Sequence, residues 1–141
     1  MKKFFALCCS AIFIVSTAVN VYAKDLVIGE RFFITQINAV YQNPKSYLGS
    51  TISYEGIFDQ YDSYDGSEPH SLVFRYGPGC CGPDALAGFE VVWDKPYPKK
   101  DAWVRAEGVL EEYTIDRVKF LRLRLISLVV LEKRGKEVLT R

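Results

Sequence analysis

Cysteine is scarce in this sequence, and histidine is scarcer. The 141 residues contain four cysteines and one histidine. Two of the cysteines fall within the first 23 residues, which leaves only the adjacent pair Cys80 and Cys81 for the rest of the chain. Small exported folds that depend on disulfides need several spaced cysteines. A disulfide scaffold is therefore excluded, and the core must form by burial of apolar side chains.

The sequence also lacks an excess of charge of either sign. Its formal net charge is +1, whereas nucleic-acid-binding domains are usually strongly basic. We therefore expect no nucleic-acid partner. Aromatic residues make up 14% of the chain, far more than in disordered tails. Together with the length of 141 residues, these features predict one globular domain.

The one long apolar run lies at the N-terminus and has the pattern of a signal peptide. Lys2 and Lys3 precede the run, and Ala23 ends a small-x-small cleavage pattern directly before a charged pair. We predict a signal peptide over residues 1–23, cleavage after Ala23 and a single domain over residues 24–141. An uncleaved membrane anchor is the alternative, because the run reaches the short end of a spanning helix.

No second long apolar run follows residue 23, so we expect no stable membrane insertion after cleavage. Loss of Lys2 and Lys3 leaves 16 basic against 17 acidic residues, a net charge of −1. The predicted location of the mature chain is the periplasm or the outside of the cell, where disulfides are allowed.

The periodicity of apolar residues predicts one helix followed by strands. In residues 31–42, Phe33, Ile37 and Val40 fall on one helical face, and Pro44 ends the helix. Alternating or short apolar patterns then predict strands near 51–58, 71–76, 89–93, 102–110 and 118–131.

Two of these strands contain a glycine after a glutamate, Gly56 and Gly108. A glycine bend lets one strand serve two sides of a small closed sheet. One helix, about five strands and two bends predict a mostly β, OB-like five-stranded barrel with an N-terminal helix. A small α+β sandwich is the alternative.

The loop over residues 77–88 is the most informative stretch for function. It contains four glycines and two prolines around Cys80 and Cys81, with Asp84 close behind. Two thiolates and a carboxylate suit zinc or another thiophilic metal ion. His70, from the preceding loop, is a candidate fourth ligand. We therefore predict a metal or small-ligand site formed by Cys80, Cys81, Asp84 and His70.

Two other interpretations of the cysteine pair stay open. Adjacent thiols can close a strained disulfide, and strained disulfides have oxidising potentials, so the chain is alternatively a periplasmic thiol redox protein. The pair is otherwise a structural feature with no chemistry of its own. The sequence has no nucleophile elbow, phosphate-binding loop or dinucleotide fingerprint, so we expect a non-enzymatic protein.

The loop is part of a longer pattern that resembles a known family. The pattern is an arginine, four residues, two cysteines, two residues, Asp-Ala, two residues and a glycine. It consists here of Arg75, Cys80, Cys81, Asp84, Ala85 and Gly88. It is similar to the extracytoplasmic C-terminal domain of a poorly characterised group of bacterial membrane proteins that accompany predicted permeases. A weaker similarity, Asn43-Pro44 followed by Tyr47-Leu48-Gly49, extends the resemblance to roughly residues 32–131.

The resemblance implies an OB-like fold and a functional Cys-Cys-Asp loop. It also implies a membrane permease or another envelope protein as partner. As part of the pattern, Arg75 is predicted to contact the bound ligand. In that group the domain follows transmembrane helices, whereas here it follows a predicted signal peptide, so the chain looks like a free-standing version.

Overall fold

The computed structural model describes residues 24–63, 66–80, 82 and 84–139. The predicted signal peptide and its cleavage site at Ala23 lie outside the described residues. The elements are β1 (Leu26–Ile28), η1 (Glu30–Phe32), α1 (Phe33–Gln42), η2 (Pro44–Ser46), β2 (Thr51–Tyr61), β3 (His70–Gly77), β4 (Ala85–Val92), β5 (Ala102–Ile115) and β6 (Val118–Val130). Among the described residues, no helix is both long and apolar enough to cross a membrane.

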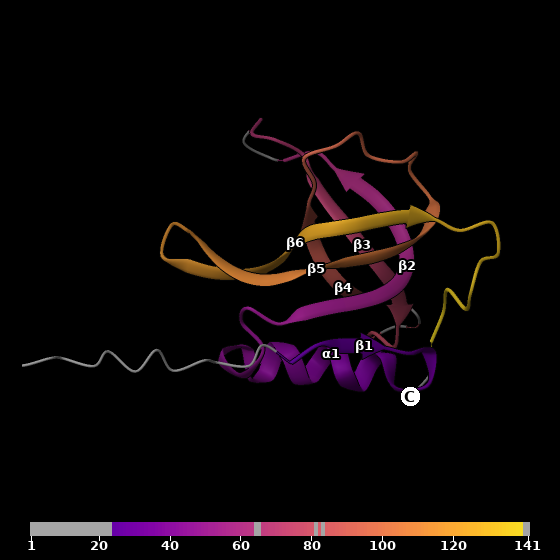
Figure 1. Cartoon of the computed structure of the whole chain (residues 1–141), viewed down its shortest axis with the longest axis horizontal. Helices are drawn as coiled ribbons and strands as arrows, with labels where there is room; N and C mark the ends of the chain where they lie inside the picture. The colour runs from indigo at the N-terminus through magenta and orange to yellow at the C-terminus, as the bar shows by residue number, and fades with distance from the viewer. Residues whose placement is uncertain (1–23, 64–65, 81, 83, 140–141) are drawn as a thin grey trace, which may run out of the picture.

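Five strands close into a barrel, which confirms the predicted fold class. Around the barrel the order is β2-β3-β4-β6-β5, and β5 pairs again with β2. The β4–β6 pairing is parallel, and the other four pairings are antiparallel. Each of these strands is therefore paired on both sides, although β4 and β6 pair only over Glu90–Val92 and Arg122–Arg124. Figure 1 shows the closed barrel, with the β5–β6 hairpin projecting from one side.

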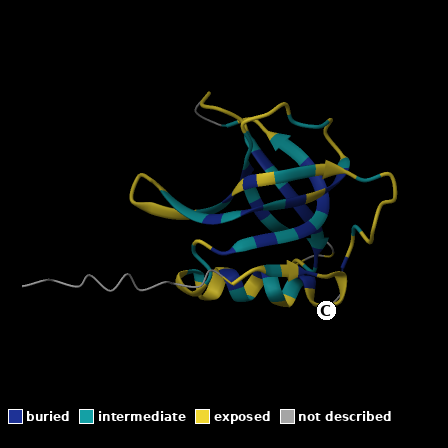
Figure 2. Cartoon of the chain, in the orientation of Figure 1, coloured by how far each residue is buried: buried dark blue, intermediate teal, exposed yellow. Residues whose placement is uncertain are grey.

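The helix closes one end of the barrel, as its apolar face predicts. Phe33, Ile37 and Val40 are all buried and belong to the same apolar cluster as the barrel interior. Figure 1 shows α1 lying across this end, and Figure 2 shows the buried positions concentrated on the barrel strands and on the side of the helix that faces them. One short strand was not predicted: β1 pairs in parallel with β2 through Leu26–Ile28.

Of the two glycine bends predicted from the sequence, the one at Gly108 coincides with a strand irregularity, whereas Gly56 marks a close approach of two strands. The β5–β6 register shifts between Glu107 and Gly108, which marks an irregularity of the β-bulge kind. At Gly56 the neighbouring strand is very close, because an added Cβ would lie 2.7 Å from the carbonyl oxygen of Phe74. Both positions therefore permit the sharp coiling that a small barrel needs.

The segment after β6 returns across the outside of the barrel. Leu131 N donates to Trp103 O at 2.9 Å, and Leu139 N donates to Tyr76 O at 2.8 Å. Tyr76 N in turn donates to Glu137 O at 2.8 Å. This C-terminal segment covers Trp103, which is 2% exposed. It thereby completes a second, outer apolar cluster on the barrel wall.

Candidate functional site

The residues of the Arg-Cys-Cys-Asp-Gly pattern occupy two neighbouring strands and the loop between them. Arg75 lies on β3 and pairs in register with Ala87 of β4. Gly88 is the next residue of β4, opposite Phe74. The cysteine pair and Asp84 belong to the connection that leaves β3 after Gly77. The pattern therefore combines residues of the barrel wall with residues of an adjoining loop.

Arg75 is buried in the barrel wall and is 3% exposed. Its Nε donates to Glu55 O of β2 at 2.7 Å. One of its terminal nitrogens donates to Lys136 O at 3.1 Å and to Glu30 Oε2 at 3.3 Å. The guanidinium therefore links a barrel strand, the first 3-10 turn and the C-terminal segment.

Two aromatic rings enclose the same guanidinium. Its carbon lies 4.8 Å from the ring centroids of both Phe33 and Trp103, within the range of cation–π attraction. Burial lowers the pKa of Arg75, although the nearby carboxylates of Glu30 and Glu55 act in the opposite direction. These contacts engage Arg75 with groups of the protein itself. The predicted contact with a ligand is untested and stays a prediction.

Gly88 has a backbone role on the facing strand. An added Cβ would lie 2.0 Å from the carbonyl oxygen of Val73 and 2.8 Å from Cα of Phe74. Any side chain here would push β3 and β4 apart. Arg75 thus ties β3 to β2 and to the C-terminal segment, and Gly88 lets β4 pack closely against β3.

The loop itself is tightly turned. Gly79 N donates to Gly82 O at 2.7 Å, and Gly82 adopts a φ of 140°, a conformation suited to glycine. The Asp84 carboxylate folds back onto the residue before Cys80, because a Cβ on Gly79 would lie 1.6 Å from Asp84 Oδ1. Cys80 and Asp84 are both exposed. Cys81 lies outside the described residues.

His70 is separated from this loop. It begins β3, whereas the loop leaves from Gly77 at the other end of the strand. At about 3.3 Å per residue, the two points are about 23 Å apart along the strand. The imidazole Nδ1 lies 3.2 Å from Glu90 Oε1 instead. The structure therefore brings Cys80 and Asp84 into one loop but does not bring His70 to them.

No group of three or more histidine, cysteine or acidic side chains placed to hold a metal ion is found among the residues that the structure describes. The described loop contributes Cys80 and Asp84, and the sequence adds Cys81 as the neighbour of Cys80. Metal binding by this set is untested and stays a prediction.

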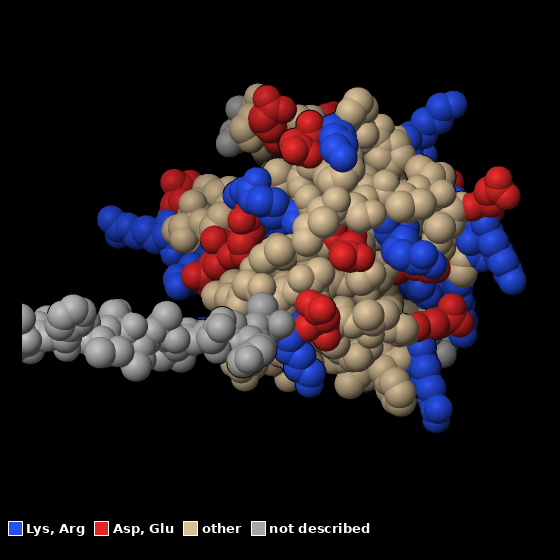
Figure 3. Space-filling model, in the orientation of Figure 1, with Lys and Arg blue, Asp and Glu red and all other residues tan. Residues whose placement is uncertain are grey.

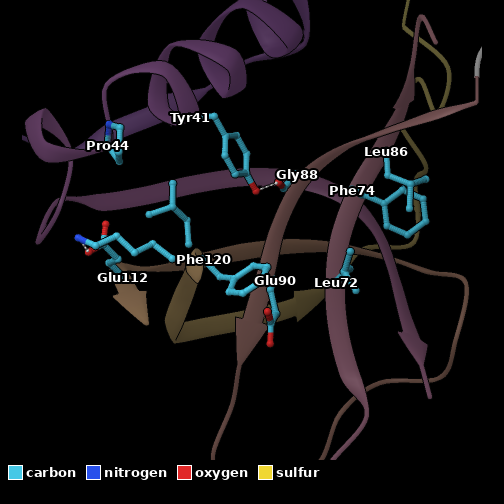
Figure 4. A pocket seen from close by; sticks show the side chains of 11 residues that line it. Tyr41, Pro44, Leu72, Phe74, Leu86, Gly88, Glu90, Glu112 and Phe120 are labelled. Carbon is cyan, nitrogen blue, oxygen red and sulfur yellow. Dashed lines mark hydrogen bonds and ion pairs between the residues drawn. The ribbon is translucent and has the colours of Figure 1, made fainter. Parts of the chain in front are cut away.

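A second candidate site is a groove that the sequence analysis missed. It has a volume of about 460 Å³ and lies between the β3–β4 face, the start of β6 and the end of α1 (Figure 4). Its lining side chains are mostly apolar and include the half-buried carboxylates of Glu90 and Glu112, together with Lys119. The sequence did contain one indication of it. Inward and outward residues alternate along β4, so Glu90 faces away from the core into which Phe89 and Val91 are buried.

Charges of both signs are interspersed on the face of the molecule drawn in Figure 3. Many charged side chains of the described residues are paired across neighbouring strands, such as Arg105 with Glu55 at 2.7 Å. On β5 and β6, Glu111 pairs with both Arg122 at 2.6 Å and Arg124 at 2.9 Å. That face therefore presents no continuous basic patch.

The fold and the loop define a small closed β-barrel domain with an exposed cysteine-bearing connection. Comparison with known families shows that the chain belongs to the family of the DUF1980 C-terminal domain, a domain of unknown function. The family model matches residues 16–133. This confirms the resemblance to a family without an assigned activity. The permease partner stays a prediction. Comparison with curated proteins found no match.

Proposed function

We propose that this chain is an exported, non-enzymatic binding protein of the bacterial cell envelope. Its Cys80-Cys81-Asp84 loop would hold a thiophilic metal ion such as zinc. The observation that carries the proposal is the geometry of the loop. Cys80 and Asp84 are both exposed on one tight turn, and the Asp84 carboxylate is folded against the residue that precedes Cys80.

The ligand types fit such an ion. Thiolates bind zinc and copper(I) well, and a carboxylate oxygen completes a mixed shell for zinc. Since the structure places His70 elsewhere, the loop supplies three candidate ligands. A tetrahedral ion would then keep one position for solvent or for a group from another molecule.

The place of the loop supports a role in exchange with a partner. It extends from the barrel wall, and its two exposed ligands can be reached without opening the core. The strands on either side are held by Arg75 and Gly88, which do not need the metal for their contacts. We propose a membrane permease or another envelope protein as the partner that delivers or receives the ion.

Native mass spectrometry of the protein purified from the cell envelope, without chelator or reductant, tests this proposal. The expected mass is that of residues 24–141 plus one metal ion. Cys80→Ser, Cys81→Ser and Asp84→Asn should each reduce metal retention. Asp116→Asn is the matched control, because this exposed turn residue has a φ of 46°, which asparagine tolerates.

Other masses would contradict the metal proposal. A metal-free mass lighter by two hydrogens would indicate a Cys80–Cys81 disulfide and favour the thiol redox function. A metal-free dithiol would indicate cysteines without a role in binding. A mass that includes residues 1–23 would contradict cleavage after Ala23 and favour a retained anchor.

A further inference from the structure

The groove beside the β3–β4 face exists because β4 and β6 separate. These strands pair only through Glu90–Val92 and Arg122–Arg124. Before that point, the start of β4 and the start of β6 form opposite walls of the groove, and Figure 4 shows Tyr41 of α1 at one end. Tyr41 OH donates to Gly88 O of β4 at 2.9 Å. The volume of about 460 Å³ is that of a small-molecule site.

The walls of this groove are apolar and aromatic. Leu72 and Phe74 of β3 contribute to one wall, and Phe120 of β6 stands on the other (Figure 4). Leu86 and Phe120 are 46% and 42% exposed, which is high for side chains of their size. A ligand with an apolar body would remove this surface from water.

Among the charged residues that line the groove, Glu90 is the one whose charge is not offset by a lysine or an arginine of the described chain. Its Oε2 accepts a hydrogen bond from Tyr113 OH, and its Oε1 faces His70 Nδ1 at 3.2 Å. No lysine or arginine among the described residues lies within ion-pair distance of it. The pKa of Tyr113 is raised, mainly by burial and in addition by its hydrogen bond to Glu90. The pKa of Tyr41 is raised to about 12, mainly by burial and in addition by the charge of Glu90.

The neighbouring carboxylates, unlike that of Glu90, are paired with lysine or arginine side chains. Glu112, at the rim of the groove, pairs with Lys119 at 2.7 Å. Arg122 is the register partner of Glu90, but its Nε donates to Glu111 and its guanidinium lies 4.6 Å from the ring centroid of Tyr113. With His70 neutral, the groove therefore carries one negative charge that no lysine or arginine pairs with, set among aromatic rings, an arrangement that attracts an organic cation.

We propose that this groove binds a small organic cation, a primary ammonium or guanidinium group carried on an apolar body. The cationic group would ion-pair with Glu90, and the body would lie against Phe120 and Leu72. This inference does not depend on the cysteine loop or on metal binding, because the groove is formed by other residues.

Titration of metal-free protein with phenethylammonium, followed by amide chemical shifts in NMR spectra, tests the proposal. Saturable shifts are expected along the start of β4 and β6 and at Tyr41. The neutral isostere 2-phenylethanol should bind at least about tenfold more weakly, because it cannot form the ion pair. Equal binding of the amine and the alcohol would overturn the proposal.

Two variants make the test specific to the groove. Glu90→Gln still accepts the Tyr113 hydrogen bond and should weaken the amine by about tenfold. Phe120→Ala should weaken both probes and gives a second readout if Glu90→Gln does not fold. Glu132→Gln, which removes an exposed carboxylate after β6, should leave the affinity unchanged. Unchanged binding in both groove variants, or shifts outside the groove, would refute the inference.

Discussion

Replacement of the buried Arg75 by methionine tests whether the hydrogen bonds of its guanidinium stabilise the barrel. The methionine side chain can still pack between the rings of Phe33 and Trp103, but it donates no hydrogen bond. The change leaves Glu55 O and Lys136 O without the donor that they have at 2.7 and 3.1 Å. The variant therefore separates hydrogen bonding from packing.

The expected loss can be estimated from these contacts. A hydrogen bond to a charged donor contributes about 1.5–3 kcal/mol, and two such bonds are lost. The pair with Glu30 adds less than about 1 kcal/mol, because that carboxylate is half-exposed. We expect the free energy of unfolding to fall by about 3–7 kcal/mol, out of a typical total of about 5–15 kcal/mol. The melting temperature should fall by about 10–25 °C.

Urea denaturation followed by tryptophan fluorescence is the appropriate assay, since Trp103 lies against the guanidinium. Arg75→Lys is the matched control: an ammonium keeps the charge but cannot reach both carbonyls in the arginine geometry, so an intermediate loss is expected. A loss below about 1 kcal/mol in Arg75→Met would refute this reasoning. If metal or ligand binding then failed in a fully stable variant, Arg75 would be a ligand contact as predicted from the family pattern.

Three further predictions concern the barrel. Gly88→Ala should lower the free energy of unfolding by about 1–3 kcal/mol in urea, because its Cβ would meet the β3 backbone; an unchanged midpoint would contradict the close approach. Tyr54→Phe should cost about 1–3 kcal/mol, because the buried hydroxyl donates to Val73 O at 2.7 Å and accepts from Phe89 N at 3.0 Å; thermal melting measures it. Burial raises the pKa of Glu111, but Arg122 and Arg124 outweigh burial and lower it. The stabilising contribution of ionised Glu111 is therefore present above its unfolded pKa of about 4.3. It is lost as the pH falls through the lower pKa of the folded state. The stability difference from Glu111→Gln should shrink between about pH 5 and 3, and a difference that grows there would contradict this sign.

Local patterns were sufficient for most of the fold. Alternation in residues 51–58 predicted β2, and the structure extends that strand to Tyr61 through polar residues that pair with β3. Gly108 predicted an irregularity because a bulge is a local property of the strand. The short strand β1 was missed because its partner, Ile52–Tyr54, lies more than twenty residues away. A three-residue parallel pairing leaves no periodic signal in the sequence.

The candidate sites were less predictable, because they depend on contacts between distant segments. The position of Arg75 within an apolar strand gave no warning that Phe33 and Trp103 would enclose it. His70 was grouped with the cysteines by sequence distance, but the strand between them carries it to the opposite end. In the sequence, Glu90 looks like an ordinary solvent-facing acid of an alternating strand. The groove around it forms only because β4 separates from β6, and local patterns do not show this.

Competition for zinc between the reduced protein and a chromophoric chelator tests the proposed function most directly. We expect one zinc ion per chain, and a Cys80→Ser/Cys81→Ser variant with an affinity at least about tenfold lower. The metal-free variant should melt within about 2 °C of the wild type, because the exposed loop is separate from the barrel contacts. Equal affinity in both proteins would contradict the assignment of metal binding to this loop.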